Sequence, residues 1–365
     1  MNRRLQALHD AGVSIWLDTL SRELLDTGAF EALIEDSSVT GATSNPMIFA
    51  KAITGSDRYD AQLRETHASG IDDPQELFFG LALDDVRRAA DLLRPTYDTS
   101  DGRDGFVSFE CTPDLADDTA GTIEQAVDLW GRLARPNVMI KVPATAAGVP
   151  AIEELTARGI NVNVTLLFSL RRYDEVIQAY LRGLERRVDH SDSLAQIASV
   201  ASFFVSRVDA KADAQLIDES PLRGRIAIAN ANRAYDLYAN RFGDERWERL
   251  SSAGARPQRP LWASTGTKDP DYSDVLYVEQ LIAPGVINTM PNATMQAFSD
   301  HGTVAHTLGT DANKAWRTVI AADNVGVDLE RITTELEREG VESFCASYRE
   351  LLDCIEGKLA AISAP

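Results

Sequence analysis

Short strand-like runs alternate with longer helix-like stretches from one end of the 365-residue chain to the other. Most runs are rich in β-branched or aromatic residues, which favour strands. Eight such runs occur: Ser14–Asp18, Gly41–Asn45, Phe106–Cys111, Val138–Pro143, Asn161–Phe168, Val200–Arg207, Pro260–Thr265 and Gly285–Thr289. Eight strand–helix units at this length predict an α/β fold, a (β/α)8 TIM barrel with additional helices. An open, doubly wound sheet is the alternative.

Amphipathic stretches between the runs predict helices at Arg22–Asp36, Asp73–Leu93, Thr122–Leu133, Ala147–Arg158, Arg171–Arg186 and Ala227–Arg241. Ser21 and Thr119 are candidate caps for the first and third of them. The connection around residues 48–95 is long, and residues 311–363 are rich in helical patterning. We therefore expect extra helices around 48–95 and 311–363, packed outside the barrel or over its mouth. No repeat or linker interrupts the pattern, which favours one domain over residues 1–365.

The amino-acid composition and net charge of the chain argue against several classes of function. The net charge is −20 and the pI is near 4.7, so nucleic acid and anionic membranes are unfavourable partners. No apolar run approaches the length of a membrane span, and the first residues lack a secretory h-region. The three cysteines, Cys111, Cys345 and Cys354, form neither a disulfide framework nor a zinc motif. We expect a cytoplasmic protein.

Lys141 is an unusual residue in its context. Lysine accounts for only six of the 36 Lys and Arg residues, yet Lys141 lies inside the apolar run Val138–Pro143. An ammonium in a buried strand loses hydration, which favours the neutral amine. A neutral amine in a dry pocket can attack a carbonyl to form a Schiff base. The alternative is an edge strand whose lysine extends to water.

Polar residues recur at the ends of the other predicted strands, where barrel enzymes place their chemistry. They are Asp18, Asn45, Glu110, Asn163, Thr165, Ser202, Arg207 and Ser264. Period-two alternation places Asn163 and Thr165 on the face opposite Val162 and Val164. Each residue also has a structural interpretation: a helix cap, a turn, an ion pair or a satisfied polar group in the core. Their joint arrangement around Lys141 favours a catalytic interpretation.

These residue types support one reaction scheme. The amine attacks a ketone, and the carbinolamine loses water with help from Glu110 and Thr165. Asp18 takes the proton from a sugar hydroxyl as the adjacent carbon–carbon bond breaks. Asn45, Asn163 and Ser202 donate or accept hydrogen bonds with substrate hydroxyls, and Arg207 and Lys268 bind a phosphate.

The motifs that hold these residues resemble the transaldolase family. They are Trp16-Leu17-Asp18, Thr43-Ser44-Asn45-Pro46, Val107-Ser108-Phe109-Glu110, Ile140-Lys141-Val142-Pro143, Asn163-Val164-Thr165-Leu166-Leu167-Phe168 and Ser202-Phe203-Phe204-Val205-Ser206-Arg207. They follow the family's order over roughly residues 14–290. The resemblance implies a class I aldolase-type barrel of the pentose phosphate pathway. Its members move a dihydroxyacetone unit from sedoheptulose 7-phosphate to glyceraldehyde 3-phosphate, without a metal or other cofactor.

The resemblance implies a role for each matching position. Lys141 matches the Schiff-base lysine, Asp18 the acid/base, and Glu110 and Thr165 the pair that holds water. Asn45, Asn163 and Ser202 match hydroxyl contacts, and Arg207 and Ser264 match phosphate contacts. Phe204 stands where related fructose 6-phosphate aldolases have tyrosine, which favours transfer. Many members have an arginine where Gly266 stands here, and we expect Lys268 to replace it.

Three alternatives stay open: an aldolase that releases free dihydroxyacetone, a non-catalytic sugar-phosphate binder and a metal-dependent barrel hydrolase. The last is weakest, because the five histidines show no pair flanking a strand end. They are His9, His67, His190, His301 and His306. The expected partners are phosphorylated sugars, and the sequence leaves monomer and homodimer open.

Overall fold

Eight parallel strands close into a barrel, in which each strand pairs with the next along the chain and the last pairs with the first. The computed structural model describes residues 2–363. The strands are β1 (Ser14–Leu17), β2 (Val39–Thr43), β3 (Phe106–Glu110), β4 (Val138–Pro143), β5 (Val162–Leu167), β6 (Ser199–Phe204), β7 (Arg259–Ala263) and β8 (Ile287–Met290). The predicted (β/α)8 barrel is confirmed, and the doubly wound alternative is wrong.

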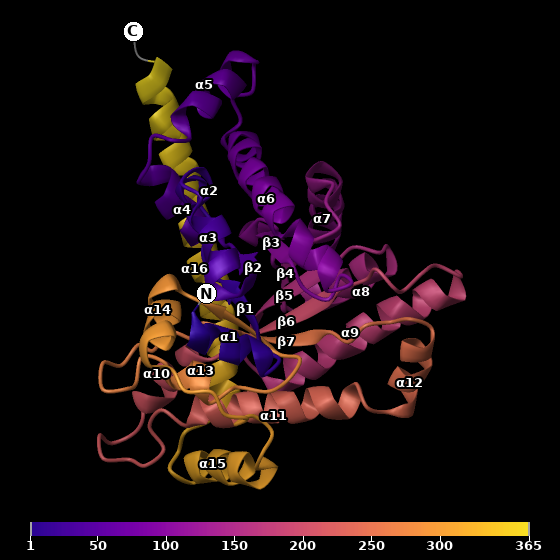
Figure 1. Ribbon diagram of the computed structural model, residues 1–365, viewed down its shortest axis with the longest axis vertical. Helices are drawn as coiled ribbons and strands as arrows, with labels where there is room; N and C mark the ends of the chain where they lie inside the picture. Colours follow the sequence, from indigo (N-terminus) through magenta and orange to yellow (C-terminus); the bar gives the residue numbers. More distant parts are fainter. Residues whose placement is uncertain (1, 364–365) are drawn as a thin grey trace.

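Helices surround this barrel (Figure 1). They are α1 (Arg3–Asp10), α2 (Arg22–Asp26), α3 (Ala29–Ser37), α4 (Pro46–Thr54), α5 (Asp60–Ala68), α6 (Pro74–Thr99), the short 3-10 helix η1 (Pro113–Leu115), α7 (Thr119–Leu133), α8 (Gly148–Ala157), α9 (Leu170–Asp189), α10 (Ser206–Asp213), α11 (Ile226–Arg241), α12 (Glu245–Ser252), α13 (Leu276–Glu279), α14 (Asn292–His301), α15 (Ala312–Asn324) and α16 (Leu329–Ser363). Within the described residues, no helix is both long and apolar enough to cross a membrane.

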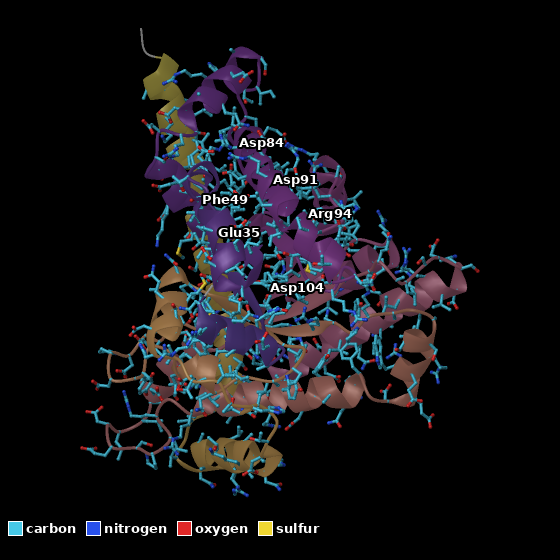
Figure 2. All side chains as sticks on the ribbon, in the orientation of Figure 1. Glu35, Phe49, Asp84, Asp91, Arg94 and Asp104 are labelled. Atoms are coloured by element: carbon cyan, nitrogen blue, oxygen red, sulfur yellow. The ribbon has the colours of Figure 1, made fainter. Side chains whose placement is uncertain are left out.

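The expected extra helices are present. Residues 48–95 include most of α4, all of α5 and most of α6, and residues 311–363 form α15 and α16. Phe49 of α4 joins an aromatic cluster with Phe78 of α6 and Phe109 of β3, and the centroid of its ring lies 5.7 and 6.0 Å from theirs. Figure 2 shows Phe49 beside α4, and Asp84, Asp91 and Arg94 spaced along α6. One continuous cluster of buried apolar side chains runs from Leu5 to Ile355.

Several predicted boundaries need correction. The stretch Arg22–Asp36 is two helices, α2 and α3, because the chain turns at Gly28, where φ is +73° in the left-handed region that favours glycine. Ser21 caps α2 as expected. The cap of α7 is Asp118, whose Oδ1 accepts from the backbone of Ala120 and Gly121, and Thr119 is the first helical residue.

Six of the eight predicted strands end one to three residues earlier than expected, among them the two predicted to hold Arg207 and Ser264. Arg207 lies in the first turn of α10, since β6 ends at Phe204. Ser264 follows β7 with φ at +55°, a left-handed turn that ends the strand. Both residues therefore stand just beyond a strand, at the end of the barrel where its loops gather.

Strand register aligns the candidate residues inside the barrel. Glu110 lies opposite Lys141 in the β3–β4 pairing, and Lys141 lies opposite Asn163 in the β4–β5 pairing. Residues at one level of neighbouring strands point to the same side of a sheet. Trp16 of β1 packs so closely on β2 that a Cβ at Gly41 would lie 2.5 Å from its ring. Trp16 Nε1 donates to Asp104 (labelled in Figure 2) over 2.8 Å.

Candidate active site

Lys141 is buried inside the barrel and points at polar partners. Lys141 is 5% exposed, and every residue of β4 is buried. Nζ donates to the carbonyl oxygen of Ser44 over 2.9 Å and lies 3.4 Å from Oε2 of Glu110. The edge-strand alternative is wrong, since β4 pairs with both β3 and β5.

Glu110 and Thr165 flank the lysine on neighbouring strands. Burial raises the pKa of Glu110, and the ammonium of Lys141 opposes that shift. The side chain of Thr165 is fully buried, and among the described residues its Oγ1 has no hydrogen-bond partner. A buried hydroxyl without a partner is costly, so the cavity in front of Thr165 is a suitable place for a bound water or substrate oxygen.

Asp18 follows β1 and reaches the same cavity. Its Oδ1 accepts from Thr43 Oγ1 over 3.0 Å, and Thr43 Oγ1 lies 2.8 Å from Oγ1 of Thr289. Burial raises the pKa of Asp18, while the charges of Lys141 and Arg207 and the bond from Thr43 lower it. Asp18 is half-buried, and the opposing effects of burial and nearby positive charge suit its carboxyl group to taking up and returning a proton.

Asn163 of β5 links β3 and β6 through its side chain at the level of the lysine. Its Nδ2 donates to Ser108 Oγ over 2.9 Å, and its Oδ1 accepts from Ser202 Oγ over 2.7 Å. Asn45 caps α4 by accepting from the backbone of Ile48 over 3.0 Å. No described residue accepts from its Nδ2, which is left for the cavity that Asn45 lines.

Two further cations, Arg207 and Lys268, line the same cavity as Lys141. The guanidinium of Arg207 lies 5.3 Å from the ring centroid of Phe204, and no described carboxylate forms an ion pair with either cation. Arg207 is half-buried, and this burial lowers its pKa. Ser264 Oγ lies 2.9 Å from Ser206 Oγ at the start of α10. Together these groups form a site suited to binding an anion.

Gly266 lines the cavity next to α14. A Cβ there would lie 3.2 Å from Oγ1 of Thr294, closer than an ordinary contact. Lys268 lines the cavity two residues later. This arrangement is compatible with the expected replacement of an arginine at 266 by Lys268.

One cavity of about 210 Å³ collects nearly all the predicted residues. It contains Asp18, Asn45, Lys141, Thr165, Ser202, Phe204, Arg207, Ser264 and Lys268. Glu110 and Asn163 lie directly behind it, bonded to Lys141 and Ser202. A larger hollow of about 1130 Å³ at the opposite, N-terminal end of the barrel includes none of them.

Several residues of the cavity were not predicted as site residues. They are Thr43, Met47, Ile48, Ala263, Gly266, Thr289, Pro291 and Phe344. Thr43 belongs to the Thr43-Ser44-Asn45-Pro46 motif, and Thr289 ends a predicted strand, so position alone could have indicated both. Phe344 comes from α16, far along the chain, and no sequence signal connects it with the barrel.

Comparison with known proteins identifies the family. The sequence profile described as Transaldolase/Fructose-6-phosphate aldolase matches residues 15–355. The chain belongs to this family. A transaldolase of Thermobifida fusca (strain YX) is 48% identical over 367 residues, which cover 99% of this chain and 100% of the relative. Transaldolases of Acidothermus cellulolyticus and Mycolicibacterium smegmatis are each 49% identical, covering 98% and 99% of this chain and 98% of each relative.

Among the described residues, no group of three or more His, Cys, Asp and Glu side chains is arranged to hold a metal ion. The transaldolase/fructose-6-phosphate aldolase family resemblance expected from the motifs is confirmed, and it extends over nearly the whole chain.

Proposed function

We propose that this protein is a transaldolase, a transferase that moves a dihydroxyacetone unit from sedoheptulose 7-phosphate to glyceraldehyde 3-phosphate through a Schiff base on Lys141. The observation that carries the proposal is the dehydrated amine of Lys141, bounded by Glu110 and facing a cavity that also holds Asp18 and Thr165. The relatives named transaldolase, about half identical over their full length, support the reaction type.

The first step joins the lysine to the donor ketone. Glu110 takes a proton from Lys141 Nζ, which the raised pKa of this carboxyl favours, and the neutral amine attacks the C2 carbonyl. The resulting carbinolamine loses water to become an iminium ion. A water held by Glu110 and the unpartnered hydroxyl of Thr165 carries the proton to the leaving oxygen.

The second step breaks and remakes a carbon–carbon bond. Asp18 takes the proton of the C4 hydroxyl, the C3–C4 bond breaks, and its electrons move into the iminium to give an enamine on Lys141. Erythrose 4-phosphate leaves. The enamine carbon then attacks the aldehyde carbon of glyceraldehyde 3-phosphate, and Asp18 returns its proton to the new hydroxyl. Addition of water to the iminium releases fructose 6-phosphate and restores the lysine.

The remaining residues bind the sugar phosphate. Asn45 and Ser202 hydrogen-bond the hydroxyls near the lysine, and Asn163 acts on these hydroxyls through Ser202, from which it accepts a hydrogen bond. Arg207, Ser264 and Lys268 bind the phosphate. Arg207 has no carboxylate partner among the described residues, so its charge is available to a phosphate. Phe204 offers an aromatic face without a hydroxyl, which withholds a proton donor from the enamine.

An assay of products tests this function. With sedoheptulose 7-phosphate and glyceraldehyde 3-phosphate we expect erythrose 4-phosphate and fructose 6-phosphate in equal amounts, and Lys141→Ala should remove both. Lys314→Ala, on α15 and outside the site, is the matched control and should retain activity. Release of free dihydroxyacetone without an acceptor would indicate an aldolase. Binding with unchanged sugar phosphates would indicate a non-catalytic binder. Either result overturns the proposal.

We further infer a single domain over residues 1–365 that works in the cytoplasm with phosphorylated sugars as its partners, as a monomer or a homodimer. The continuous core from Leu5 to Ile355 supports the single domain. The net charge of −20 supports a protein that avoids nucleic acid and anionic lipid. Sedimentation equilibrium would distinguish monomer from dimer.

A further inference from the structure

The long C-terminal helix α16 supplies one wall of the catalytic cavity. It packs on α4, α5, α6, α10 and β5, and Figure 1 shows it in yellow behind α4 and the first strands. Phe344 lies near its middle, is 3% exposed, and lines the cavity together with Lys141 and Arg207. It is the one described residue after Pro291 that does so.

The helix is seated closely on the strand that carries Thr165. Gly340 is one turn before Phe344, so both lie on one face of α16. A Cβ at Gly340 would lie 2.9 Å from Cδ2 of Leu166, which shows how near α16 comes to β5. Leu166 has φ at +58°, and the pairing of β5 with β6 shifts register between Val164 and Leu167. Gly340 therefore lies against the irregular part of β5 next to Thr165, and Phe344 lies one turn further along the same face of α16 and lines the cavity with Thr165.

The next turn of α16 is also fixed. Tyr348 donates from its hydroxyl to Gln75 Oε1 over 2.9 Å, and its ring meets Phe78 edge to face at 6.1 Å between centroids. Gly340, Phe344 and Tyr348 thus form one face, held at both ends by direct contacts. A side chain between two such anchors keeps its place when substrate enters and leaves.

We propose that Phe344 is a specificity-determining residue, which keeps water from the enamine so that the dihydroxyacetone unit is transferred rather than released. The inference rests on the proposed transaldolase function. Phe344 has neither donor nor acceptor, so as a wall it brings no proton and no ordered water to the reacting carbon. Its buried ring closes the cavity on the side of α16.

The enamine has two fates, and Phe344 acts on the choice between them. In transfer, the enamine carbon C3 forms a bond with the aldehyde carbon, whose oxygen takes the proton from Asp18. In release, C3 takes a proton from water or from Asp18 and becomes an iminium. Addition of water to that iminium then gives free dihydroxyacetone and the ammonium of Lys141. Both fates end with addition of water to an iminium, and they differ at C3, which takes up a proton only in release. A water admitted beside C3 can supply that proton, so its admission favours release.

The test measures free dihydroxyacetone per fructose 6-phosphate formed, with sedoheptulose 7-phosphate as donor and glyceraldehyde 3-phosphate as acceptor. Phe344→Ala should raise this ratio about tenfold, a difference of about 1.4 kcal/mol between the two barriers. Phe344→Leu keeps most of the volume and should raise the ratio less, so it remains informative where the alanine variant folds poorly. The matched control is Leu336→Ala, a buried position on the same helix that does not line the cavity.

The Leu336→Ala control distinguishes the loss of water exclusion at the cavity from a general loss of protein stability. Leu336→Ala should lower the unfolding temperature while leaving the product ratio as in the wild type. An unchanged ratio in both Phe344 variants overturns the inference, and so does an equal rise in Leu336→Ala. A wild type that forms no transfer product would instead overturn the transaldolase function, because the Phe344 inference concerns only how the enamine partitions.

Discussion

Nζ of Lys141 lies 3.4 Å from Oε2 of Glu110, and both side chains are less than a tenth exposed. A buried ion pair is stable only when its partners compensate for lost hydration. Here the carbonyl of Ser44 accepts from the same Nζ over 2.9 Å. Burial favours the protonated form of Glu110, so transfer of the proton from lysine to carboxyl costs less than it would in water. This pair provides a route to the neutral amine.

Glu110→Gln should slow formation of the Schiff base, because the amide cannot accept the lysine proton or pass one to the leaving hydroxyl. We expect a fall in kcat of about 10²- to 10⁴-fold, the range for loss of a general acid–base. Rapid-quench measurement of the borohydride-reducible adduct checks this directly. The circular dichroism spectrum should match that of the wild type. A kcat within twofold of the wild type would contradict the assignment of Glu110.

Arg207→Ala should weaken phosphorylated donors far more than unphosphorylated dihydroxyacetone donors. A charge-assisted hydrogen bond contributes about 1.5–3 kcal/mol, so kcat/KM for a phosphorylated donor should fall about 10- to 100-fold. Lys268→Ala should act in the same direction with a smaller effect, because Lys268 is exposed. The comparison is kcat/KM for both donor types, with Lys314→Ala as the control. Equal losses for both donors would give Arg207 a structural role instead.

Asp209 should make stability depend on pH. It is buried, accepts from the backbone of Ala227 and from the hydroxyl of Tyr277, and burial raises its pKa from 3.8 to about 7. Between these values the folded protein binds a proton that the unfolded chain has lost, so stability falls as pH rises. The stabilisation is fully present below pH 3.8 and is lost as pH passes about 7.

Asp209→Asn removes this titration. The difference in unfolding free energy between wild type and Asp209→Asn should change by about 1.4 kcal/mol per pH unit between about pH 5 and 6 and level off above about pH 8. Urea unfolding at several pH values measures it. A constant difference over this range would mean that Asp209 has the same pKa in both states.

Phe49→Ala should lower the free energy of unfolding by about 3–5 kcal/mol, since it removes a fully buried ring from the cluster with Phe78 and Phe109. This cluster joins α4 to α6 and to β3 of the barrel. Under the single-domain proposal, the loss should appear as one shifted urea transition with an unchanged slope. Two separate transitions would show that α4 and its neighbours unfold independently of the barrel.

The positions of the strands could be predicted from the local sequence pattern, but the residues at which they end could not. The strand Val138–Pro143 is buried on both faces, so its sequence is an apolar run, and it was predicted at its actual bounds. Arg207 was placed in a strand, but the backbone turns into α10 after Phe204. That turn depends on the loop after β7, where Ser264 approaches Ser206, and such a tertiary contact has no local signature.

The candidate site was predictable to the extent that it consists of strand-end residues. Lys141, Asp18 and Thr165 meet because closing the barrel brings the ends of β4, β1 and β5 together. Phe344 could not be predicted in this way, since its position depends on how α16 packs across the barrel. Thr289 was within reach of the same reasoning as Thr165, as the last but one residue of β8.

The chemistry of Lys141 is tested most directly by borohydride reduction in the presence of fructose 6-phosphate, followed by peptide mapping. We predict a covalent dihydroxyacetone adduct on Lys141 and none on Lys268, the other lysine of the cavity. Absence of any adduct, or an adduct only on another lysine, would contradict the account.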